Sequence, residues 1–333
     1  MKNGTVQIEA FESKLLAGNP LGDPVLRKLP VYLPPSYYNS STEYPVVLCL
    51  AGYTGGARSW LNFQAWIPSI DERADALIDQ GMPEMVLVFP DCFTILGGSQ
   101  YLDSIAVGRY RSHLLQEILP LVERKYRVKR DRRFRGVMGK SSGGYGAITI
   151  AMEHPDLFST VACHSGDMFF EYCYLSEFPI ACRRLRQLGG LNGFFQKFDE
   201  LQKNGKEIHA VLDTVAMSAC YSPNPDAPHL IDLPFHLDTG ELKPDIWRKW
   251  KEKDPVEMIR KNPACLKNFG YIYIDCGMRD EFALDVGARI FSAELERNRI
   301  PHTHEEFDDG HFNIQYRYDV SLKAIAGYFQ SQQ

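Results

Sequence analysis

The stretch Gly139-Lys140-Ser141-Ser142-Gly143 combines a serine hydroxyl with glycines two residues before and two residues after it. A serine on a sharp turn between a strand and a helix has its hydroxyl exposed, and flanking glycines let the neighbouring backbone approach closely. An apolar run before the turn and a helical pattern after it favour this arrangement over a plain Gly/Ser loop. We therefore predict that Ser141 is a nucleophile. Ser142 is the alternative, but the same spacing around it requires glycine at position 140, where the chain has lysine.

A serine nucleophile needs a base to accept its proton and an acid to orient that base. His311 follows the last predicted strand on a glycine-containing loop, and Asp280 lies in the loop after the preceding strand. The chain order serine, aspartate, histidine is typical of a catalytic triad on a mostly parallel sheet. His164 competes with His311 as the base, but it precedes every plausible acid in the chain. The competitors of Asp280 are Asp275, Glu281 and Asp285, of which the first lies inside a predicted strand and the last on a predicted helix.

The negative charge that develops on the substrate during attack needs N–H donors. We predict that these are the backbone N–H groups of Ser142 and of Tyr53, which lies in the glycine-rich turn 51–56. On its own, this turn would equally fit an ordinary strand-to-helix connection. Further residues near these turns are predicted to bind substrate: Gly52, Trp60, Gln100, Tyr101 and Lys140. Phe63 is another candidate for the wall of a pocket.

Apolar runs alternate with amphipathic patterns along most of the chain. The predicted strands are 45–50, 85–90, 134–138, 158–163, 271–276 and 303–307, and residues 5–33 add an antiparallel hairpin at the edge. The predicted helices are 70–81, 109–128, one from the Ser141 turn to His154, 284–299 and 319–330. Such alternation predicts an α/β fold with a mostly parallel central sheet and helices on both faces. The serine turn and the order serine, aspartate, histidine then favour the α/β-hydrolase fold within that class. The turns 51–56, 91–101, 139–144 and 164–168 all lie at the carboxyl ends of strands, where ligands bind in such sheets.

The alternation of strands and helices stops between about Asp167 and Asn268. This segment is rich in aromatic residues and has helical patches and a proline-rich loop, 222–228. We predict that the chain forms a single domain over residues 1–333 and that 167–268 is a mostly helical lid inserted into it. A separate small domain is the alternative, but the strand pattern resumes after the segment, which favours a lid.

Composition restricts the functions that the chain can have. It has 333 residues, and 37 basic against 42 acidic residues give a net charge of −5 without a long basic block, which argues against a nucleic-acid partner. No apolar signal segment or membrane-spanning run is visible, so we expect a cytoplasmic protein; a mature secreted form is left open, as is a homodimer. The eight cysteines show no CxxC pair, and the spacing of His302, His304, Asp308, Asp309 and His311 does not suit a metal pair. We expect neither metal nor cofactor.

These motifs resemble the esterase D-like branch of the α/β-hydrolases, which includes S-formylglutathione hydrolases, feruloyl and acetylxylan esterases, enterochelin esterases and mycolyl transferases. The residues that carry the resemblance are Val31-Tyr32-Leu33-Pro34-Pro35, Leu50-Ala51-Gly52-Tyr53, Pro90-Asp91, Gly139 to Gly146, Cys276 to Phe282 and Asp309-Gly310-His311. The resemblance implies a metal-free serine hydrolase with Ser141, Asp280 and His311 as its triad. The chain departs from the family pattern at Ala51, where many members have histidine, at Lys140 and Ser142, and in its long insertion.

The chemistry and the resemblance together predict a serine carboxylic-ester hydrolase. It would act through an acyl-enzyme on a small-molecule ester with a small or aromatic, feruloyl-like, acyl group. An acyl transferase with the same triad is one alternative, because an alcohol can replace water as the acceptor of the acyl group. A non-catalytic binding module of the same fold is the other, although the intact triad order argues against it.

Overall fold

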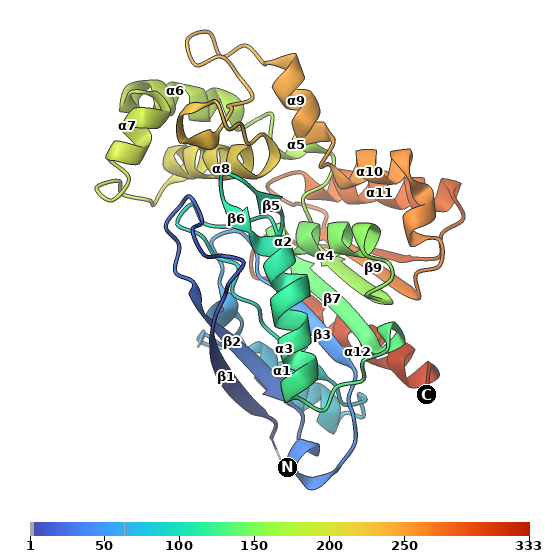
Figure 1. The fold of residues 1–333 in the computed structure, drawn as a ribbon. Helices are drawn as coiled ribbons and strands as arrows, with labels where there is room; N and C mark the ends of the chain where they lie inside the picture. The colour runs from blue at the N-terminus through green and yellow to red at the C-terminus, as the bar shows by residue number, and fades with distance from the viewer. Residues whose placement is uncertain (1–2, 63) are drawn as a thin grey trace.

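The computed structural model describes residues 3–62 and 64–333, and an eight-stranded sheet lies at its centre (Figure 1). The strand order is β1-β2-β4-β3-β7-β8-β9-β10. The strands are β1 (Thr5–Glu12), β2 (Leu26–Leu33), β3 (Val46–Leu50), β4 (Val86–Val88), β7 (Arg135–Lys140), β8 (Thr160–His164), β9 (Tyr271–Gly277) and β10 (Thr303–Phe307). Neighbouring strands from β4 to β10 are parallel, whereas β2 is antiparallel to both β1 and β4. The predicted mostly parallel sheet is therefore confirmed.

Helices cover both faces of the sheet. One face packs against α1 (Ile70–Asp79) and α12 (Tyr318–Ser331). The other packs against α2 (Tyr110–Ser112), α3 (Leu119–Lys125), α4 (Ser142–Glu153) and α11 (Leu284–Arg297). Every residue of β3 is buried, which explains why its sequence is continuously apolar rather than alternating. Helix α1 begins at a capping box, in which the Ser69 N–H donates to Glu72 Oε2 over 2.8 Å.

The predicted helix 109–128 differs from the structure in its middle. It is divided into α2, a π-helical stretch (His113–Ile118) and α3. Pro120 lies in the first turn of α3, where it has no N–H to donate to the preceding turn. A widened turn before the proline accommodates the missing hydrogen bond, which periodicity alone does not reveal.

The smaller elements connect this framework. The loop after β4 contains a two-stranded ribbon, β5 (Asp103–Ser104) and β6 (Gly108–Arg109). Short 3-10 turns occur at Tyr37–Asn39, Ala57–Leu61, Arg132–Phe134, Pro228–Leu230, Pro263–Leu266 and Gln315–Arg317.

The segment between β8 and β9 is helical. It contains α5 (Phe170–Cys173), α6 (Phe178–Leu188), α7 (Gly190–Gln196), α8 (Lys206–Tyr221), α9 (Pro244–Lys251) and α10 (Pro255–Lys261). Figure 1 shows α6 to α9 gathered beyond the carboxyl ends of the strands, whereas α10 lies against α4 and α11. Fully buried Trp250 stands among the rings of Phe178, Tyr174 and Tyr221, so these helices share an aromatic core. That the segment acts as a lid stays a prediction.

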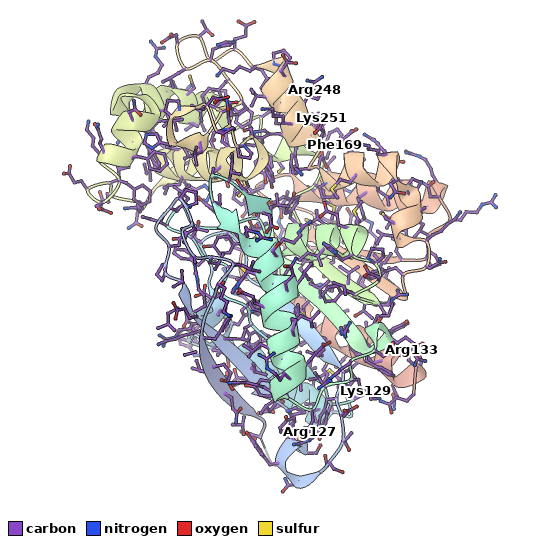
Figure 2. All side chains as sticks on the ribbon, in the orientation of Figure 1. Arg127, Lys129, Arg133, Phe169, Arg248 and Lys251 are labelled. Atoms are coloured by element: carbon purple, nitrogen blue, oxygen red, sulfur yellow. The ribbon has the colours of Figure 1, made fainter. Side chains whose placement is uncertain are left out.

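Basic side chains lie at opposite ends of the molecule (Figure 2). Arg127, Lys129 and Arg133 are near the amino end of β7, where Arg127 stacks over the Tyr37 ring at 4.0 Å and Lys129 over the Phe134 ring at 3.9 Å. Arg248 and Lys251 are on α9, at the other end. These aromatic contacts give the first group a structural role, because they cover apolar surface with the stems of the charged side chains.

Candidate active site

Ser141 occupies the sharp turn between β7 and α4. Its backbone has φ 57° and ψ −127°, a sparsely populated positive-φ conformation that costs a residue other than glycine about 1–3 kcal/mol. The Ser141 N–H donates to the carbonyl of His164 over 2.9 Å. A Cβ atom on Gly139 would lie 2.3 Å from the Gly143 carbonyl oxygen, and one on Gly143 would lie 2.0 Å from that of Leu50. Both glycines of the motif are therefore required by close backbone contacts.

Asp280 and His311 form a buried pair. His311 Nδ1 donates to Asp280 Oδ2 over 2.8 Å, and both residues are less than a tenth exposed. The N–H groups of Phe282 and Leu284 donate to Asp280 Oδ1 over 2.9 Å and 3.4 Å. Burial alone would raise the pKa of Asp280, but His311 and these backbone N–H groups outweigh burial and lower it. Asp280 is therefore held ionised, and it fixes His311 with Nδ1 occupied and Nε2 left for other partners.

Three further side chains contact His311. The His311 N–H donates to Glu281 Oε2 over 2.6 Å. The rings of Phe282 and Phe312 stand edge-on to the imidazole, with centroids 4.9 Å and 5.3 Å away. Glu281, a competitor of Asp280 in the sequence, therefore holds the backbone of the histidine instead of its ring.

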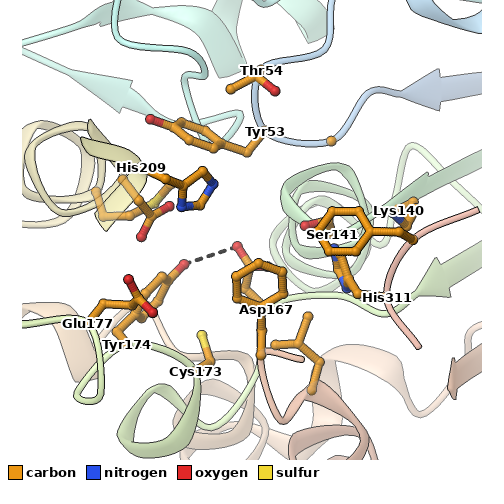
Figure 3. A pocket seen from close by; sticks show the side chains of 16 residues that line it. Tyr53, Thr54, Lys140, Ser141, Asp167, Cys173, Tyr174, Glu177, His209 and His311 are labelled. Carbon is orange, nitrogen blue, oxygen red and sulfur yellow. Dashed lines mark hydrogen bonds between the residues drawn. The ribbon is translucent and has the colours of Figure 1, made fainter. Parts of the chain in front are cut away.

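Ser141 and His311 both line a cavity of about 430 Å³ (Figure 3). In the part of the chain that the structure describes, no hydrogen bond joins the Ser141 hydroxyl to His311, whose ring is bonded to Asp280. The rest of the wall comes from the turn after β3, from the end of β7, from the segment between β8 and β9 and from the loops beside His311. These residues are Gly52, Tyr53, Thr54, Lys140, Asp167, Cys173, Tyr174, Glu177, His209, Asp213, Met217, Phe282, Leu284 and Phe312.

The turn 51–56 packs directly against the serine. A Cβ atom on Gly52 would lie 3.5 Å from the Ser141 Cβ. The Tyr53 hydroxyl donates to the Leu96 carbonyl over 2.8 Å, and the Thr54 N–H donates to the Gly97 carbonyl over 2.9 Å. Within residues 3–62 and 64–333, the backbone N–H groups of Tyr53 and Ser142 donate to no protein acceptor. Both are therefore available to a ligand.

The structure separates the predicted substrate-binding residues into two groups. Gly52 and Lys140 line the cavity of Ser141. They also line a second cavity of about 350 Å³ on the other side of the turn 51–56, whose wall includes Trp60. The Lys140 ammonium group lies 5.6 Å from the centre of the Phe312 ring, and burial lowers the pKa of this lysine. Phe63 lies outside the described residues.

Gln100 and Tyr101 lie behind the cavity wall, and neither lines either cavity. Both have positive φ values, 48° and 52°. The Tyr101 hydroxyl donates to the Ala51 carbonyl over 2.6 Å. Gln100 Nε2 donates to Asp167 Oδ2 over 3.0 Å, and its Oε1 accepts from the Ser142 hydroxyl. Both residues therefore support the cavity wall from behind in this structure, and their role in binding substrate stays a prediction. Because the Ser142 hydroxyl donates to Gln100 Oε1, it is less available than the Ser141 hydroxyl to act as a nucleophile.

Three carboxyl groups that sequence reasoning missed share the cavity wall: Asp167, Glu177 and Asp213. Among the described residues, none of them forms an ion pair with a lysine or arginine, and they outnumber Lys140, which lines the same cavity, so we call these three residues the acidic wall. Burial raises the pKa of Asp167, and burial together with Asp167 and Glu177 raises that of Asp213. Asp167 follows β8 in the turn 164–168, so the sequence carried a signal for it. Glu177 and Asp213 are on or beside inserted helices, which no strand pattern places.

His164 and Asp275, the competitors from the sequence, pair with each other away from the cavity. His164 Nδ1 donates to Asp275 Oδ1 over 2.7 Å, and His164 Nε2 lies 2.9 Å from Ser321 Oγ. All three residues have no exposed surface. This serine, histidine and aspartate resemble a triad in their contacts, but no substrate can reach them.

Across residues 3–62 and 64–333, no three or more His, Cys, Asp or Glu side chains gather in a way that could hold a metal ion. None of the helices in the described part of the chain is both long and apolar enough to span a membrane.

Comparison with known proteins gives one family and several relatives. A family model described as "Putative esterase" matches residues 25–324. The uncharacterized protein YbbA of Bacillus subtilis strain 168 is 27% identical over 163 residues, which are 44% of this chain and 58% of that protein. The uncharacterized protein Cgl0967/cg1104 of Corynebacterium glutamicum is 29% identical over 140 residues, which are 40% of this chain and 31% of that protein. The match therefore spans less than two thirds of either relative.

Solved structures match over nearly the whole chain. A ferulic acid esterase has a TM-score of 0.64 at 22% identity, with 99% of each chain covered. An S-formylglutathione hydrolase from Agrobacterium tumefaciens has a TM-score of 0.61 at 16% identity, with 99% of this chain and 97% of that chain covered. The fluorophosphonate-binding serine hydrolase FphF of Staphylococcus aureus has a TM-score of 0.60 at 16% identity, with 98% of each covered. The predicted α/β-hydrolase fold and the resemblance to the esterase D-like branch are confirmed.

Proposed function

Because this chain belongs to the putative esterase family, we propose that it hydrolyses carboxylic esters with Ser141 as the nucleophile. One observation carries the proposal. A serine with a positive φ, in the turn between a strand and a helix, faces a cavity that it shares with His311, and His311 is bonded to a buried aspartate. An ordinary buried serine does not need so strained a backbone, whereas a nucleophile gains exposure from it.

The reaction begins when His311 Nε2 accepts the proton of the Ser141 hydroxyl. The serine oxygen attacks the carbonyl carbon of the ester, and the histidine then gives the proton to the departing alcohol. Asp280 holds the imidazole in the required tautomer and stabilises its charged form. The hydrogen bond from serine to histidine must form in the complex with substrate, and such bonds are often long or absent in empty sites.

The second half of the reaction releases the acid. Water, activated by His311, attacks the acyl-enzyme at the same carbonyl carbon. In both steps the carbonyl oxygen becomes negatively charged. The unpaired N–H groups of Tyr53 and Ser142 supply the donors for that oxygen. Because both donors belong to the backbone, they are fixed in place before the substrate binds.

Two cavities adjoin at Gly52, Tyr53, Thr54 and Lys140, next to Ser141, and we assign one to the acyl group and the other to the alcohol. Ser141 itself lines the larger cavity, and a bound ester can extend from there past the shared residues into the smaller one. Aromatic residues stand in each, with Phe282 in the larger cavity and Trp60 in the smaller. These walls suit a small or aromatic acyl group, and the structural likeness to a ferulic acid esterase agrees with that class.

We also propose that the chain is a single domain in which residues 167–268 form a lid over the larger cavity. His209 on α8 supports this role, because its ring stands edge-on to Tyr53 at 5.9 Å and lies 6.2 Å from Phe282. The inserted helices therefore touch both the turn that supplies an oxyanion donor and the loop beside His311. Such contacts let the lid control which ester reaches the serine.

Hydrolysis of an ester panel tests the proposal. Wild type, Ser141→Ala and the surface control Ser331→Ala are assayed with p-nitrophenyl acetate, butyrate and octanoate and with methyl ferulate. We expect wild type and Ser331→Ala to hydrolyse at least one ester at equal rates and Ser141→Ala to lose about a thousandfold or more. Equal activity of Ser141→Ala would place the nucleophile elsewhere. A wild type that is inactive on every ester and unlabelled by a fluorophosphonate would favour a binding module.

A further inference from the structure

We propose that a buried cluster centred on His164 positions the three chain segments that carry Ser141, Asp280 and His311. We call His164, Asp275, Arg317 and Ser321 the His164 cluster, and we assign them as positioning residues without contact to substrate. This inference rests on the proposed function of Ser141. It gives a role to the buried residues that the sequence offered as competitors for the triad.

Hydrogen bonds join all four residues of the His164 cluster, of which His164, Asp275 and Ser321 are fully buried and Arg317 is half-buried. His164 Nδ1 bonds to Asp275 Oδ1 over 2.7 Å, and Asp275 Oδ2 accepts from Arg317 Nε over 2.8 Å. Ser321 Oγ stands 2.9 Å from the other ring nitrogen of His164. The Tyr273 hydroxyl donates to Asp275 Oδ2 over 3.0 Å. A buried charge is costly unless every partner is in place, so such a network strongly favours one arrangement of the segments that it joins.

The cluster reaches the nucleophile through the main chain of His164. This residue ends β8, and its carbonyl accepts the N–H of Ser141 over 2.9 Å. A Cβ atom on Gly144, in the first turn of α4, would lie 2.9 Å from the same carbonyl oxygen. A shift of His164 therefore moves the serine turn directly.

The cluster reaches the acid through β9. Asp275 lies in this strand opposite His164, and its carbonyl accepts the Ser165 N–H over 2.8 Å. The strand continues to Gly277, and Asp280 follows in the next turn. A Cβ atom on Gly277 would lie 2.4 Å from the Asp309 carbonyl oxygen, so the end of β9 also touches the loop of His311. The register of Asp275 against His164 thus sets where Asp280 stands.

The cluster reaches the base through Arg317 and Ser321, which follow the His311 loop. Arg317 ends the 3-10 turn that leads into α12, and Ser321 lies in the first part of α12. Arg317 also lies over the Phe307 ring at 4.7 Å and contacts Glu305, so it bonds to β10 before the His311 loop as well as to β9. Both ends of the loop are therefore tied to one side chain.

A second cluster of the same chemistry provides a matched control. His113 has no exposed surface, its Nδ1 lies 2.7 Å from Glu117 Oε2, and Ser13 Oγ lies 3.0 Å from the same nitrogen. This cluster joins the π-helical stretch to the loop after β1, and none of its members lines a cavity beside Ser141. Its disruption should lower stability without moving the triad.

The test compares His164→Gln with His113→Gln in the full-length protein. Urea unfolding and the kinetics of p-nitrophenyl ester hydrolysis are measured for both, with wild type and Ser141→Ala as references. We expect both variants to unfold at lower urea. His164→Gln should lose about 10- to 100-fold in kcat with KM within twofold, because a shift of about 1 Å in a triad member costs about that much. His113→Gln should keep its kcat within twofold of wild type.

If His164→Gln does not fold, Ser321→Ala provides the test in its place. It removes only the hydroxyl beside His164 Nε2, and we expect a smaller fall in kcat, about three- to tenfold, again with KM unchanged. If His164→Gln and Ser321→Ala unfold at lower urea but keep the wild-type kcat, the cluster is only structural and the inference is wrong. The comparison of wild type with Ser141→Ala tests the proposed function separately. If wild type hydrolyses no ester, or if Ser141→Ala hydrolyses esters as fast as wild type, the proposed function is wrong, whatever the His164 variants show.

Discussion

Replacing Gly143 by alanine should damage both the stability and the activity of this protein. The new Cβ atom would lie 2.0 Å from the Leu50 carbonyl oxygen, 2.6 Å from the Leu50 carbonyl carbon and 2.8 Å from the Ala51 carbonyl oxygen. All three atoms belong to the backbone at the end of β3, so no side chain can rotate away. An ordinary contact requires the two segments to separate by about 1.4 Å.

The separation of α4 from the end of β3 determines how much stability and how much activity Gly143→Ala loses. Overpacking of this kind costs about 1–3 kcal/mol, and alanine returns about 1 kcal/mol through its higher helix propensity, since residue 143 is in α4. The difference is a net fall in the free energy of unfolding of up to about 2 kcal/mol. The segments that must separate carry Ser141 and the turn of Tyr53, and a misplacement of about 1 Å between reacting groups costs about a hundredfold in rate. We expect kcat for p-nitrophenyl acetate to fall by about that factor.

Gly327→Ala is the matched control for Gly143→Ala. Gly327 is also helical, in α12, and a Cβ atom there would meet nothing within 4 Å. We expect this variant to gain about 0.5–1 kcal/mol of stability and to keep full activity. Urea unfolding and ester hydrolysis measure both variants together. If Gly143→Ala is as stable and as active as Gly327→Ala, the serine turn does not pack against β3 as described.

Three further substitutions test the electrostatics of the site. Asp280→Asn should lower kcat about 10³- to 10⁴-fold, because the imidazole loses its orienting acceptor, and a fall of less than tenfold would remove Asp280 from the triad. Glu177→Gln should raise kcat/KM for an ester with an anionic acyl group about threefold or more relative to a neutral ester, because the substitution removes one negative charge that repels the anionic group. An equal change in kcat/KM for both esters would contradict this. Burial opposes ionisation of Asp275, but His164 and Arg317 outweigh burial and lower its pKa. A carboxyl group whose pKa is lowered by folding stabilises the folded protein at pH values above its ordinary pKa, near 3.8, and this stabilisation is lost as the pH falls below that value. The difference in unfolding free energy between wild type and Asp275→Asn should therefore stay constant from about pH 8 to pH 5 and shrink below about pH 4. A difference that does not vary with pH would refute this.

The sequence predicted the arrangement of the site where close packing permits only one residue type or where strand order fixes the neighbours. A Cβ atom at position 139 or 143 would overlap the backbone, so the spacing of these glycines, between an apolar run and a helical pattern, predicted the turn of Ser141. The carboxyl ends of neighbouring parallel strands meet at one edge of a sheet, and this brought the loops of Asp280 and His311 together in the prediction. In both cases the constraint is local or follows from strand order.

The sequence was not informative where the backbone takes an uncommon conformation. Gln100 and Tyr101 follow the pattern of residues at the mouth of a site, yet their positive φ values turn both side chains into the interior. Such values are rare outside glycine and leave no sequence signal in residues of this kind. The acidic wall was missed for a different reason, because Asp213 belongs to a long insertion whose helices pack by shape and not by strand register.

Labelling with a fluorophosphonate, followed by mass spectrometry of the digested protein, tests the central claim most directly. Wild type should carry one adduct on the peptide that contains Ser141, and Ser141→Ala should carry none. His311→Ala should react much more slowly than wild type, because the serine loses its base. An adduct on another residue, or equal labelling of wild type and Ser141→Ala, would contradict the assignment of Ser141 as the nucleophile.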